Sequence, residues 1–130
     1  MVYRDNTKWC ASVVSDIKTS FGGNKMALPQ NHAPYISENK NRFITKEEAH
    51  YICAIMNSPT VEKFILQSSD SRTFKITPPI FIPEYNNKNK LHCQLSKLST
   101  IAHGKKDDIE RIRLEIDKIY ISICKQENKI

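Results

Sequence analysis

The middle of the chain most constrains the fold because it contains two helix starts separated by a break. Thr45, followed three residues later by Glu48, forms a capping box in which the threonine side chain binds a free N–H group of the first turn. Pro59 suits the first position of a helix because it has no N–H group to donate, and Ser58 before it is a favoured capping residue. The sequence therefore predicts a short helix after Thr45 that ends at Asn57, and a second short helix from Pro59.

Apolar side chains recur at helical spacing in these two segments and in two longer ones. In the first segment they are Ala49, Ile52, Cys53, Ile55 and Met56, and in the second Val61, Phe64, Ile65 and Leu66. In the third they are Leu91, Leu95, Leu98 and Ala102. After Gly104, a fourth helix opened by Asp107 and Asp108 carries Ile109, Ile112, Ile116, Ile119 and Ile123. The last two helices are expected to pack as an αα-hairpin.

The rest of the chain favours short strands. Runs of β-branched and aromatic residues predict strands at 7–16, 26–28, 33–37 and 73–76. A hairpin turn is expected at Gly22 and Gly23. The predicted fold class is therefore α+β, with short strands in a small sheet, two short helices and a C-terminal αα-hairpin. We expect residues 1–85 to form the α+β region and residues 86–130 to form a helical hairpin packed on it, in a single domain or a fragment of a longer enzyme.

Positive charge is concentrated in one part of this 130-residue chain, whose formal net charge is +6. Residues 63–106 carry eight basic and two acidic side chains. Such a segment favours a polyanionic partner such as nucleic acid. The alternative is a basic surface that serves only solubility.

No arrangement typical of catalysis, cofactor binding or metal binding is present. The four cysteines lie far apart, without the close pairs of a zinc site. The four histidines are scattered and are interpreted as solvated or capping residues, with His50 near Glu47 on a helix surface. The charged residues of the last helix, among them Arg113 and Asp117, are interpreted as a solvated face with ion pairs. We therefore predict no catalytic residue, no cofactor and no metal.

The beginning of the chain is polar and charged, and no apolar run is long enough to span a bilayer. We accordingly expect a cytoplasmic protein without a membrane partner.

A polar, basic segment between the second helix and a predicted strand is the best candidate binding site. Arginine can bond a guanine edge with two hydrogen bonds, and serine and threonine suit phosphate oxygens. The candidate DNA contacts here are Ser69, Ser71, Arg72, Thr73 and Lys75. An N-terminal group adds Lys18, Lys25 and Asn31. The alternative is an ordinary solvated turn.

The order of motifs resembles a known family. Ile55-Met56-Asn57-Ser58-Pro59, Phe64-Ile65, the serine-rich loop, Arg72-Thr73-Phe74-Lys75-Ile76, Ile80-Phe81-Ile82-Pro83 and a helix opening near His92 follow one another. This order is similar to the C-terminal target recognition domain, of the TaqI-like specificity type, of adenine-N6 DNA methyltransferases from restriction–modification systems. Type I specificity subunits share a similar pattern.

The chain departs from that family where methyl transfer would occur. Thr77-Pro78-Pro79-Ile80 stands where such enzymes need Asn or Asp, two prolines, and Tyr or Phe, and no S-adenosylmethionine loop is present. The resemblance thus implies double-stranded DNA recognition without catalysis, beside a separate methyltransferase catalytic domain or subunit. The C-terminal isoleucine helix would be an interdomain spacer or a homodimer contact. The alternative is a protein-interaction module that docks a partner subunit without touching DNA.

Overall fold

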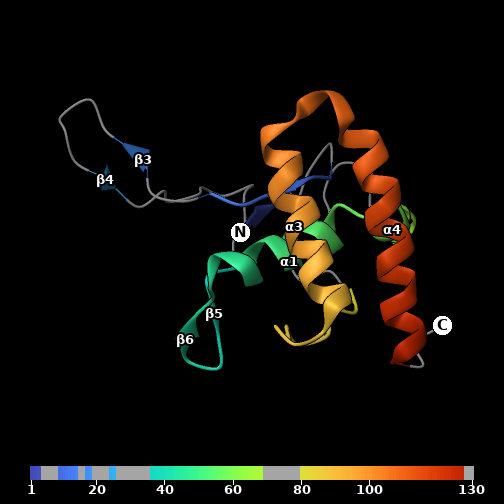
Figure 1. The fold of residues 1–130 in the computed structure, drawn as a ribbon, viewed down its shortest axis with the longest axis horizontal. Coiled ribbons are helices and arrows are strands. Elements are labelled where there is room, and N and C mark those ends of the chain that lie inside the picture. The colour runs from blue at the N-terminus through green and yellow to red at the C-terminus, as the bar shows by residue number, and fades with distance from the viewer. Residues whose placement is uncertain (4–8, 15–16, 19–23, 26–35, 69–79, 128–130) are drawn as a thin grey trace.

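The computed structural model describes residues 1–3, 9–14, 17–18, 24–25, 36–68 and 80–127. Within these residues the architecture is α+β, as the sequence predicted (Figure 1). The helices are α1 (Lys46–Met56), α2 (Pro59–Ser68), α3 (Lys90–Gly104) and α4 (Ile109–Gln126), and a single 3₁₀ turn (Lys106–Asp108) precedes α4. The predicted strands at 26–28 and 73–76, and most of the one at 33–37, lie outside the described residues.

The described strands form three antiparallel pairs, each strand two residues long. The pairs are β1 (Val2–Tyr3) with β2 (Ala11–Ser12), β3 (Ile17–Lys18) with β4 (Asn24–Lys25), and β5 (Glu38–Asn39) with β6 (Arg42–Phe43). The β3–β4 pair brackets the glycine turn expected from the sequence, although Gly22 and Gly23 themselves lie outside the described residues.

The first predicted strand is shorter than expected because helix side chains bind its backbone. Of the described residues 9–14, only Ala11 and Ser12 pair with another strand. Ala11 donates its N–H to Asn57 Oδ1 at 3.0 Å and accepts from Asn57 Nδ2 at 2.8 Å. Val13 donates its N–H to His103 Nε2 at 3.0 Å. Asn57, the C-terminal cap of α1, and His103 of α3 thus take the place of a second neighbouring strand.

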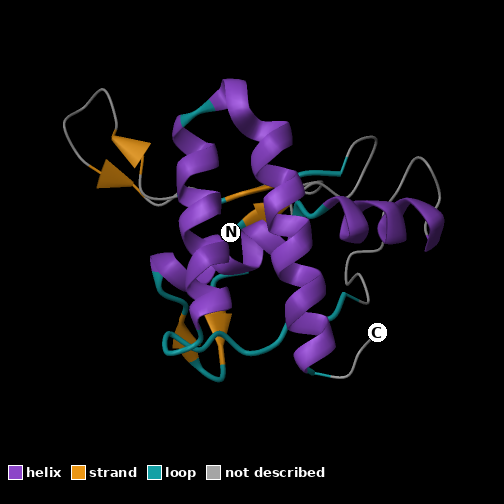
Figure 2. Cartoon of the chain, turned by 45° about the vertical axis from the view of Figure 1, so that its right-hand side comes forward, coloured by secondary structure: helices purple, strands orange, loops and turns teal. Residues whose placement is uncertain are grey.

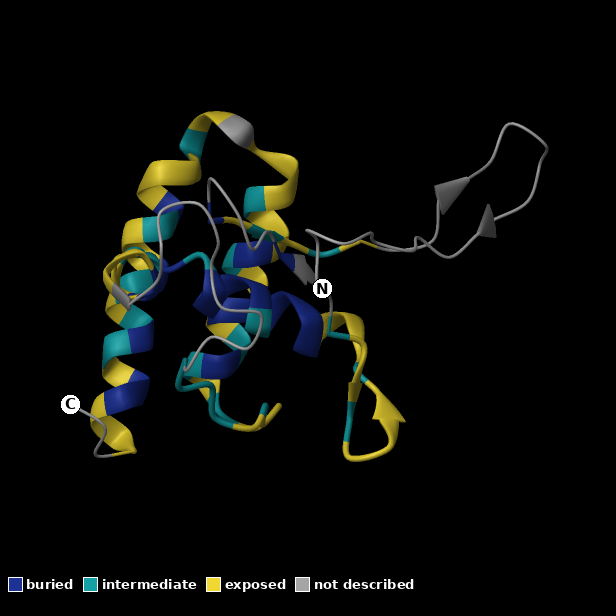
Figure 3. Ribbon diagram, turned by 180° about the vertical axis from the view of Figure 1, so that it is seen from behind, coloured by how far each residue is buried: buried dark blue, intermediate teal, exposed yellow. Residues whose placement is uncertain are grey.

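Helix α1 begins and ends at the predicted residues, but only the Thr45 half of the capping box forms, because the Glu48 carboxylate accepts no hydrogen bond within the described residues. The N–H of Glu48 donates to Thr45 Oγ1 at 3.1 Å, and Asn57 follows the last turn. α1 is almost entirely buried, with Tyr51 and Ile55 at 0% exposure. Figure 3 shows the buried positions concentrated on α1 and on the sides of α3 and α4 that face it. α1 is therefore the centre of the core.

The last two helices form the predicted antiparallel hairpin (Figure 2). Leu95 from α3, and Ile112 and Ile116 from α4, are buried, whereas Ile109 at the start of α4 is 36% exposed. One hydrophobic core contains residues from Met1 to Cys124, so it includes both regions of the predicted domain division.

Helix α2 buries fewer side chains than its sequence predicted. Val61 and Ile65 are buried, but Phe64 is 45% and Leu66 is 50% exposed. The prediction for Phe64 and Leu66 was wrong because α2 presents only a narrow stripe to the core, and these two positions fall beside it.

The β5–β6 hairpin was not predicted. Its two turn residues, Lys40 and Asn41, have φ angles of 53° and 64°. Two successive positive φ values are the mark of a type I′ turn, which matches the twist of a tight hairpin. Asparagine adopts this conformation readily, but lysine does not, so the sequence carried only half of the usual signal.

Candidate functional site

The structure describes few of the predicted DNA contacts. Ser69, Ser71, Arg72, Thr73, Lys75 and Asn31 lie outside the described residues. Lys18 and Lys25 lie in the paired strands β3 and β4, where Ile17 is opposite Lys25 and Lys18 is opposite Asn24. The pairing brings the backbones of the two lysines together on adjacent strands. The described elements on either side of the segment of residues 69–75 are α2 and residues 80–85.

The start of α2, which leads into the predicted recognition segment, is held by a carboxylate of α4. Asp117 Oδ1 accepts a hydrogen bond from Ser58 Oγ at 2.5 Å and another from the Thr60 N–H at 2.9 Å. The predicted capping role of Ser58 needs correction, because its hydroxyl donates to Asp117 and the carboxylate binds the helix N–H. Burial alone would raise the pKa of Asp117, but these hydrogen bonds outweigh it and lower the pKa.

Arg113 provides a second link between α4 and α2. Its Nε donates to the Asn57 carbonyl at 3.0 Å, Nη2 forms an ion pair with Glu62, and Nη1 lies 3.3 Å from Glu110 Oε1. Its side chain is only 24% exposed. The interpretation of Arg113 and Asp117 as parts of a solvated face was therefore wrong. Both side chains turn toward α2, which the spacing along α4 alone does not reveal.

The far end of the same segment is held by two tyrosines. Tyr120 of α4 donates its hydroxyl to the Phe81 carbonyl at 2.7 Å, and Tyr51 of α1 donates to the Pro83 carbonyl at 2.9 Å. Burial raises the pKa of both phenols, so both remain neutral donors at physiological pH. Sequence reasoning missed these residues, because a tyrosine on an apolar helix face only shows that its hydroxyl needs some partner.

Three buried or bonded histidines replace the expected solvated ones. His50 is buried and forms a hydrogen bond with Ser99 Oγ at 2.9 Å. Its ring meets that of His103 edge-on, with 4.8 Å between centroids. His92 is also buried, stacks on Tyr51 at 4.7 Å and accepts the Asn86 N–H at 3.1 Å. Burial lowers the pKa of His50 and His92, which favours their neutral forms.

A serine and a histidine lie close together beside α3, but their geometry is structural. Ser12 Oγ is 3.2 Å from His103 Nε2. The same nitrogen accepts the Val13 N–H at 3.0 Å, so its lone pair is already used and cannot serve as the base that activates a serine. The other ring nitrogen, Nδ1, lies 2.6 Å from the Ser99 carbonyl and donates to it. His103 therefore ties the N-terminal segment to α3.

Cys53 is a buried thiol without a catalytic arrangement around it among the residues described. Burial raises the pKa of the Cys53 thiol to about 11, so it stays protonated. The described residues contain no group of three or more His, Cys, Asp or Glu side chains placed to hold a metal ion. Among the described helices, none is both long and apolar enough to cross a membrane.

Comparison with models of known protein families, with curated proteins and with solved structures finds no match to this chain. The resemblance to DNA methyltransferases therefore remains a prediction from the sequence motifs.

Proposed function

We propose that this chain is the DNA target recognition module of a restriction–modification adenine-N6 methyltransferase, acting in the cytoplasm. It would bind double-stranded DNA beside a separate catalytic domain or subunit that holds S-adenosylmethionine and transfers the methyl group. In this proposal Arg72 reads a base edge or a phosphate, Lys75 neutralises a phosphate, and the hydroxyls of Ser69, Ser71 and Thr73 donate to phosphate oxygens.

The observation that carries the proposal is the double attachment of the segment between α2 and Ile80. At one end, Asp117 and Arg113 hold the start of α2, and Ile65 in its middle is at 0% exposure. At the other end, Tyr120 and Tyr51 bind the backbone that follows. Binding residues are commonly found on loops positioned by a rigid scaffold. A polar segment with two cations, attached at both ends to a packed helical core, has that arrangement.

Charge supports the same proposal. Helix α3 contains no Asp or Glu, and its lysines Lys90 and Lys97 are exposed. The chain as a whole carries a net charge of +6. Such a field attracts a polyanion and makes its binding dependent on salt concentration. β3 and β4 contribute Lys18 and Lys25 on adjacent strands, consistent with an N-terminal contact to the same polymer.

Fluorescence anisotropy with labelled duplex DNA at two salt concentrations tests the proposal. We expect weak binding of the isolated chain, micromolar or poorer, because a catalytic domain would supply further contacts. If Arg72 binds a phosphate, Arg72→Ala should weaken binding to every sequence and reduce the slope of log K against log salt by about one unit. If it reads a base, discrimination at one position should fall by about 1–3 kcal/mol.

Lys125→Ala is the matched control, since it removes one positive charge from an exposed position on the last turn of α4. It should bind DNA nearly as the wild type does. The proposed contacts are wrong if Arg72→Ala and Lys75→Ala both behave like this control. Labelled S-adenosylmethionine mixed with the chain and DNA should give no DNA labelling. Labelling without an added subunit would contradict the proposal that a separate domain or subunit transfers the methyl group.

A second candidate function, docking of a partner subunit without DNA contact, is favoured by exposed apolar side chains on two adjacent helices. Leu66 on α2 is 50% exposed, and Leu114 on α4 is 59% exposed. Under this alternative, Leu66→Ser with Leu114→Ser abolishes co-purification with a co-expressed methyltransferase subunit. Arg72→Ala would leave it unchanged, and the chain would show no DNA binding at low salt.

A further inference from the structure

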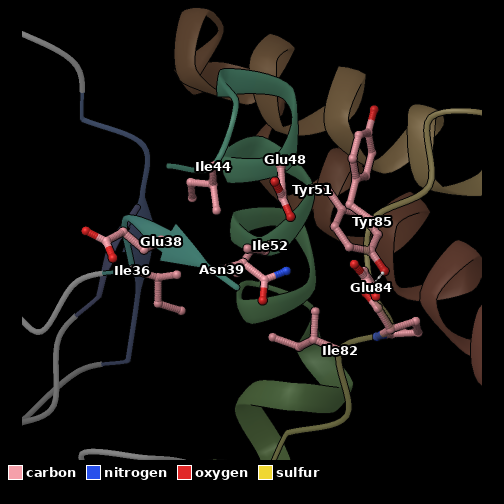
Figure 4. A pocket seen from close by; sticks show the side chains of 11 residues that line it. Ile36, Glu38, Asn39, Ile44, Glu48, Tyr51, Ile52, Ile82, Glu84 and Tyr85 are labelled. Atoms are coloured by element: carbon pink, nitrogen blue, oxygen red, sulfur yellow. Dashed lines mark hydrogen bonds between the residues drawn. The ribbon is translucent and has the colours of Figure 1, made fainter. Parts of the chain in front are cut away.

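A pocket on the side of α1 that faces the β5–β6 hairpin has a chemistry unlike the basic surface. Its volume is about 230 Å³, and it lies between α1, the β5–β6 hairpin and residues 82–85. Figure 4 shows the Glu48 carboxylate directed from α1 into the space that the lining side chains surround. The pocket therefore places a carboxylate at the end of a small, mostly apolar space.

The state of Glu48 is the unusual feature. Its side chain is only 4% exposed. Within the described residues neither carboxylate oxygen has a hydrogen-bond donor, and the carboxylate's ion pair with Arg42 Nη1 is 3.6 Å long. That distance exceeds the usual length of an N–H···O hydrogen bond. A buried carboxylate without hydrogen bonds raises the free energy of the folded protein. A hydrogen-bond donor that enters this pocket would therefore be bound favourably by Glu48.

A second carboxylate lies at the pocket mouth. Glu84 is 55% exposed and accepts from Lys40 Nζ at 2.8 Å, which lowers its pKa. The two cations that face these carboxylates, Lys40 and Arg42, both belong to the β5–β6 hairpin and are more than half exposed. Both carboxylates are thus already paired with cationic groups, which sit on an element at the surface.

The walls suit an aliphatic stem that carries a positive charge. The apolar lining comes from Ile36, Ile44, Ile52 and Ile82, and the aromatic lining from Tyr51 and Tyr85. The rings of Tyr51 and Tyr85 lie 5.2 Å apart between centroids. Aromatic faces attract cations, and isoleucine side chains favour methylene groups over water. Backbone phosphates and other anions are disfavoured beside two carboxylates.

We propose that this pocket binds an alkylammonium group, with Glu48 accepting from the ammonium and Glu84 at the mouth adding a second negative charge. The group can come from a free aliphatic diamine or from the lysine side chain of a partner protein, because both present an ammonium on a methylene stem. The ligand competes with Arg42 for Glu48. This site is separate from the proposed DNA contacts, and its test requires no DNA.

The test is a titration of the full-length, ¹⁵N-labelled protein with 1,5-diaminopentane, followed by amide NMR shifts. Sodium chloride is added to the reference sample to match ionic strength, and 1,5-pentanediol is the neutral control ligand. We expect saturable shifts at Asn39, Ile52 and Tyr85 with the diamine and none with the diol. Nα-acetyl-lysine methylamide in a parallel titration distinguishes the sources: comparable binding indicates a protein lysine, and binding of the diamine alone indicates a free amine.

Variants identify the carboxylate. Glu48→Gln should weaken binding about tenfold or more, since it removes a charge-assisted hydrogen bond. Glu84→Gln should weaken it less, and because Glu84 is exposed this variant tests the site without risk to the fold. Glu115→Gln is the matched control, since Glu115 is exposed on α4 and does not line the pocket. Equal binding by all three variants, or equal shifts with the diol, would overturn the proposal.

Discussion

The helical core and the segments around it are held by different forces. In the core, α1, α3 and α4 bury apolar side chains such as Ile55, Leu95 and Ile116, and stability follows from the area removed from water. The surrounding segments add fewer buried apolar side chains to this core, chiefly Met1, Tyr3 and Trp9. Their backbone is also held by individual hydrogen bonds from side chains in or next to the helices, as between Asn57 and Ala11 or between Tyr120 and Phe81.

This difference explains how a protein with two-residue strands keeps its irregular parts in place. A wide sheet would satisfy the backbone groups of each strand with its neighbours. Here polar side chains of the helices satisfy them instead. The core should therefore respond to changes of volume, and the periphery to the loss of single donors or acceptors.

Ile116→Ala should lower the free energy of unfolding by about 2–5 kcal/mol, because it removes buried methyl groups and leaves a cavity. Ile116 is 2% exposed. Leu114→Ala, two residues away and 59% exposed, is the matched control and should change stability by less than about 0.5 kcal/mol. Urea denaturation measures both. An unchanged midpoint for Ile116→Ala would show that the α4 seam is not part of the core.

Asn57→Ala should lower stability by about 1–3 kcal/mol, because Ala11 loses partners for its N–H and its carbonyl. Hydrogen exchange should show the Ala11 amide becoming less protected, while amides in the middle of α1 change little. Asn87→Ala, in an exposed turn, is the control. If the two variants are equally stable, side-chain bonds do not hold the N-terminal segment.

Asp117→Asn should cost about 0.5–2 kcal/mol at neutral pH, the range for loss of a helix cap. The pKa of Asp117 is lowered in the folded protein, so its contribution is complete above the unfolded pKa of about 3.9 and is lost as the pH falls through the folded pKa. The difference between wild type and variant should therefore shrink in acid. Glu115→Gln, at an exposed position on the same helix, is the control. Its difference in stability from the wild type should not change as the pH falls.

The smallest effect concerns the pH dependence conferred by His50. Burial, the neighbouring His103 and then Lys46 lower its pKa, with Glu47 opposing and the N-terminal amine adding to the shift. Stability should thus be complete above the unfolded pKa of about 6.5 and decrease as the pH falls below it. In His50→Gln, the free energy of unfolding should decrease less between pH 7.5 and 5 than in the wild type. Part of the decrease should remain, because the pKa of His92 is lowered as well. An unchanged slope would place the proton uptake elsewhere.

The helices could be read from the sequence because their signals are local. Thr45 and Asn57 mark the ends of α1, and the isoleucine spacing of α4 gives its buried face, as the structure confirms. The prediction that Phe64 is buried was wrong because a periodic pattern shows which residues share a helix face. It does not show how wide a stripe of that face the neighbouring elements cover. The β5–β6 hairpin was missed because Lys40 occupies a backbone conformation that lysine rarely adopts.

The contacts around the candidate site could not be predicted in this way, because they join residues far apart in the sequence. The sequence identified a polar, basic segment, but it did not identify the side chains that bind the elements on either side of it. Asp117 and Arg113 bind the start of α2, and Tyr51 and Tyr120 bind the backbone of residues 81–83. Each of these side chains has the same local sequence context as an ordinary surface or core residue. Their partners are far away in the chain, 59 residues between Ser58 and Asp117 and 39 between Phe81 and Tyr120.

The sequence by itself determined the four described helices, the Thr45 cap of α1 and the main apolar stripes, because those features depend on contacts within about four residues. The tertiary structure alone decided which polar side chains meet which backbone groups. It placed Asn57 against Ala11, buried His50 beside Ser99, and directed Glu48 into a pocket. These outcomes depend on how the helices pack, since packing sets both the distance between distant groups and their access to water.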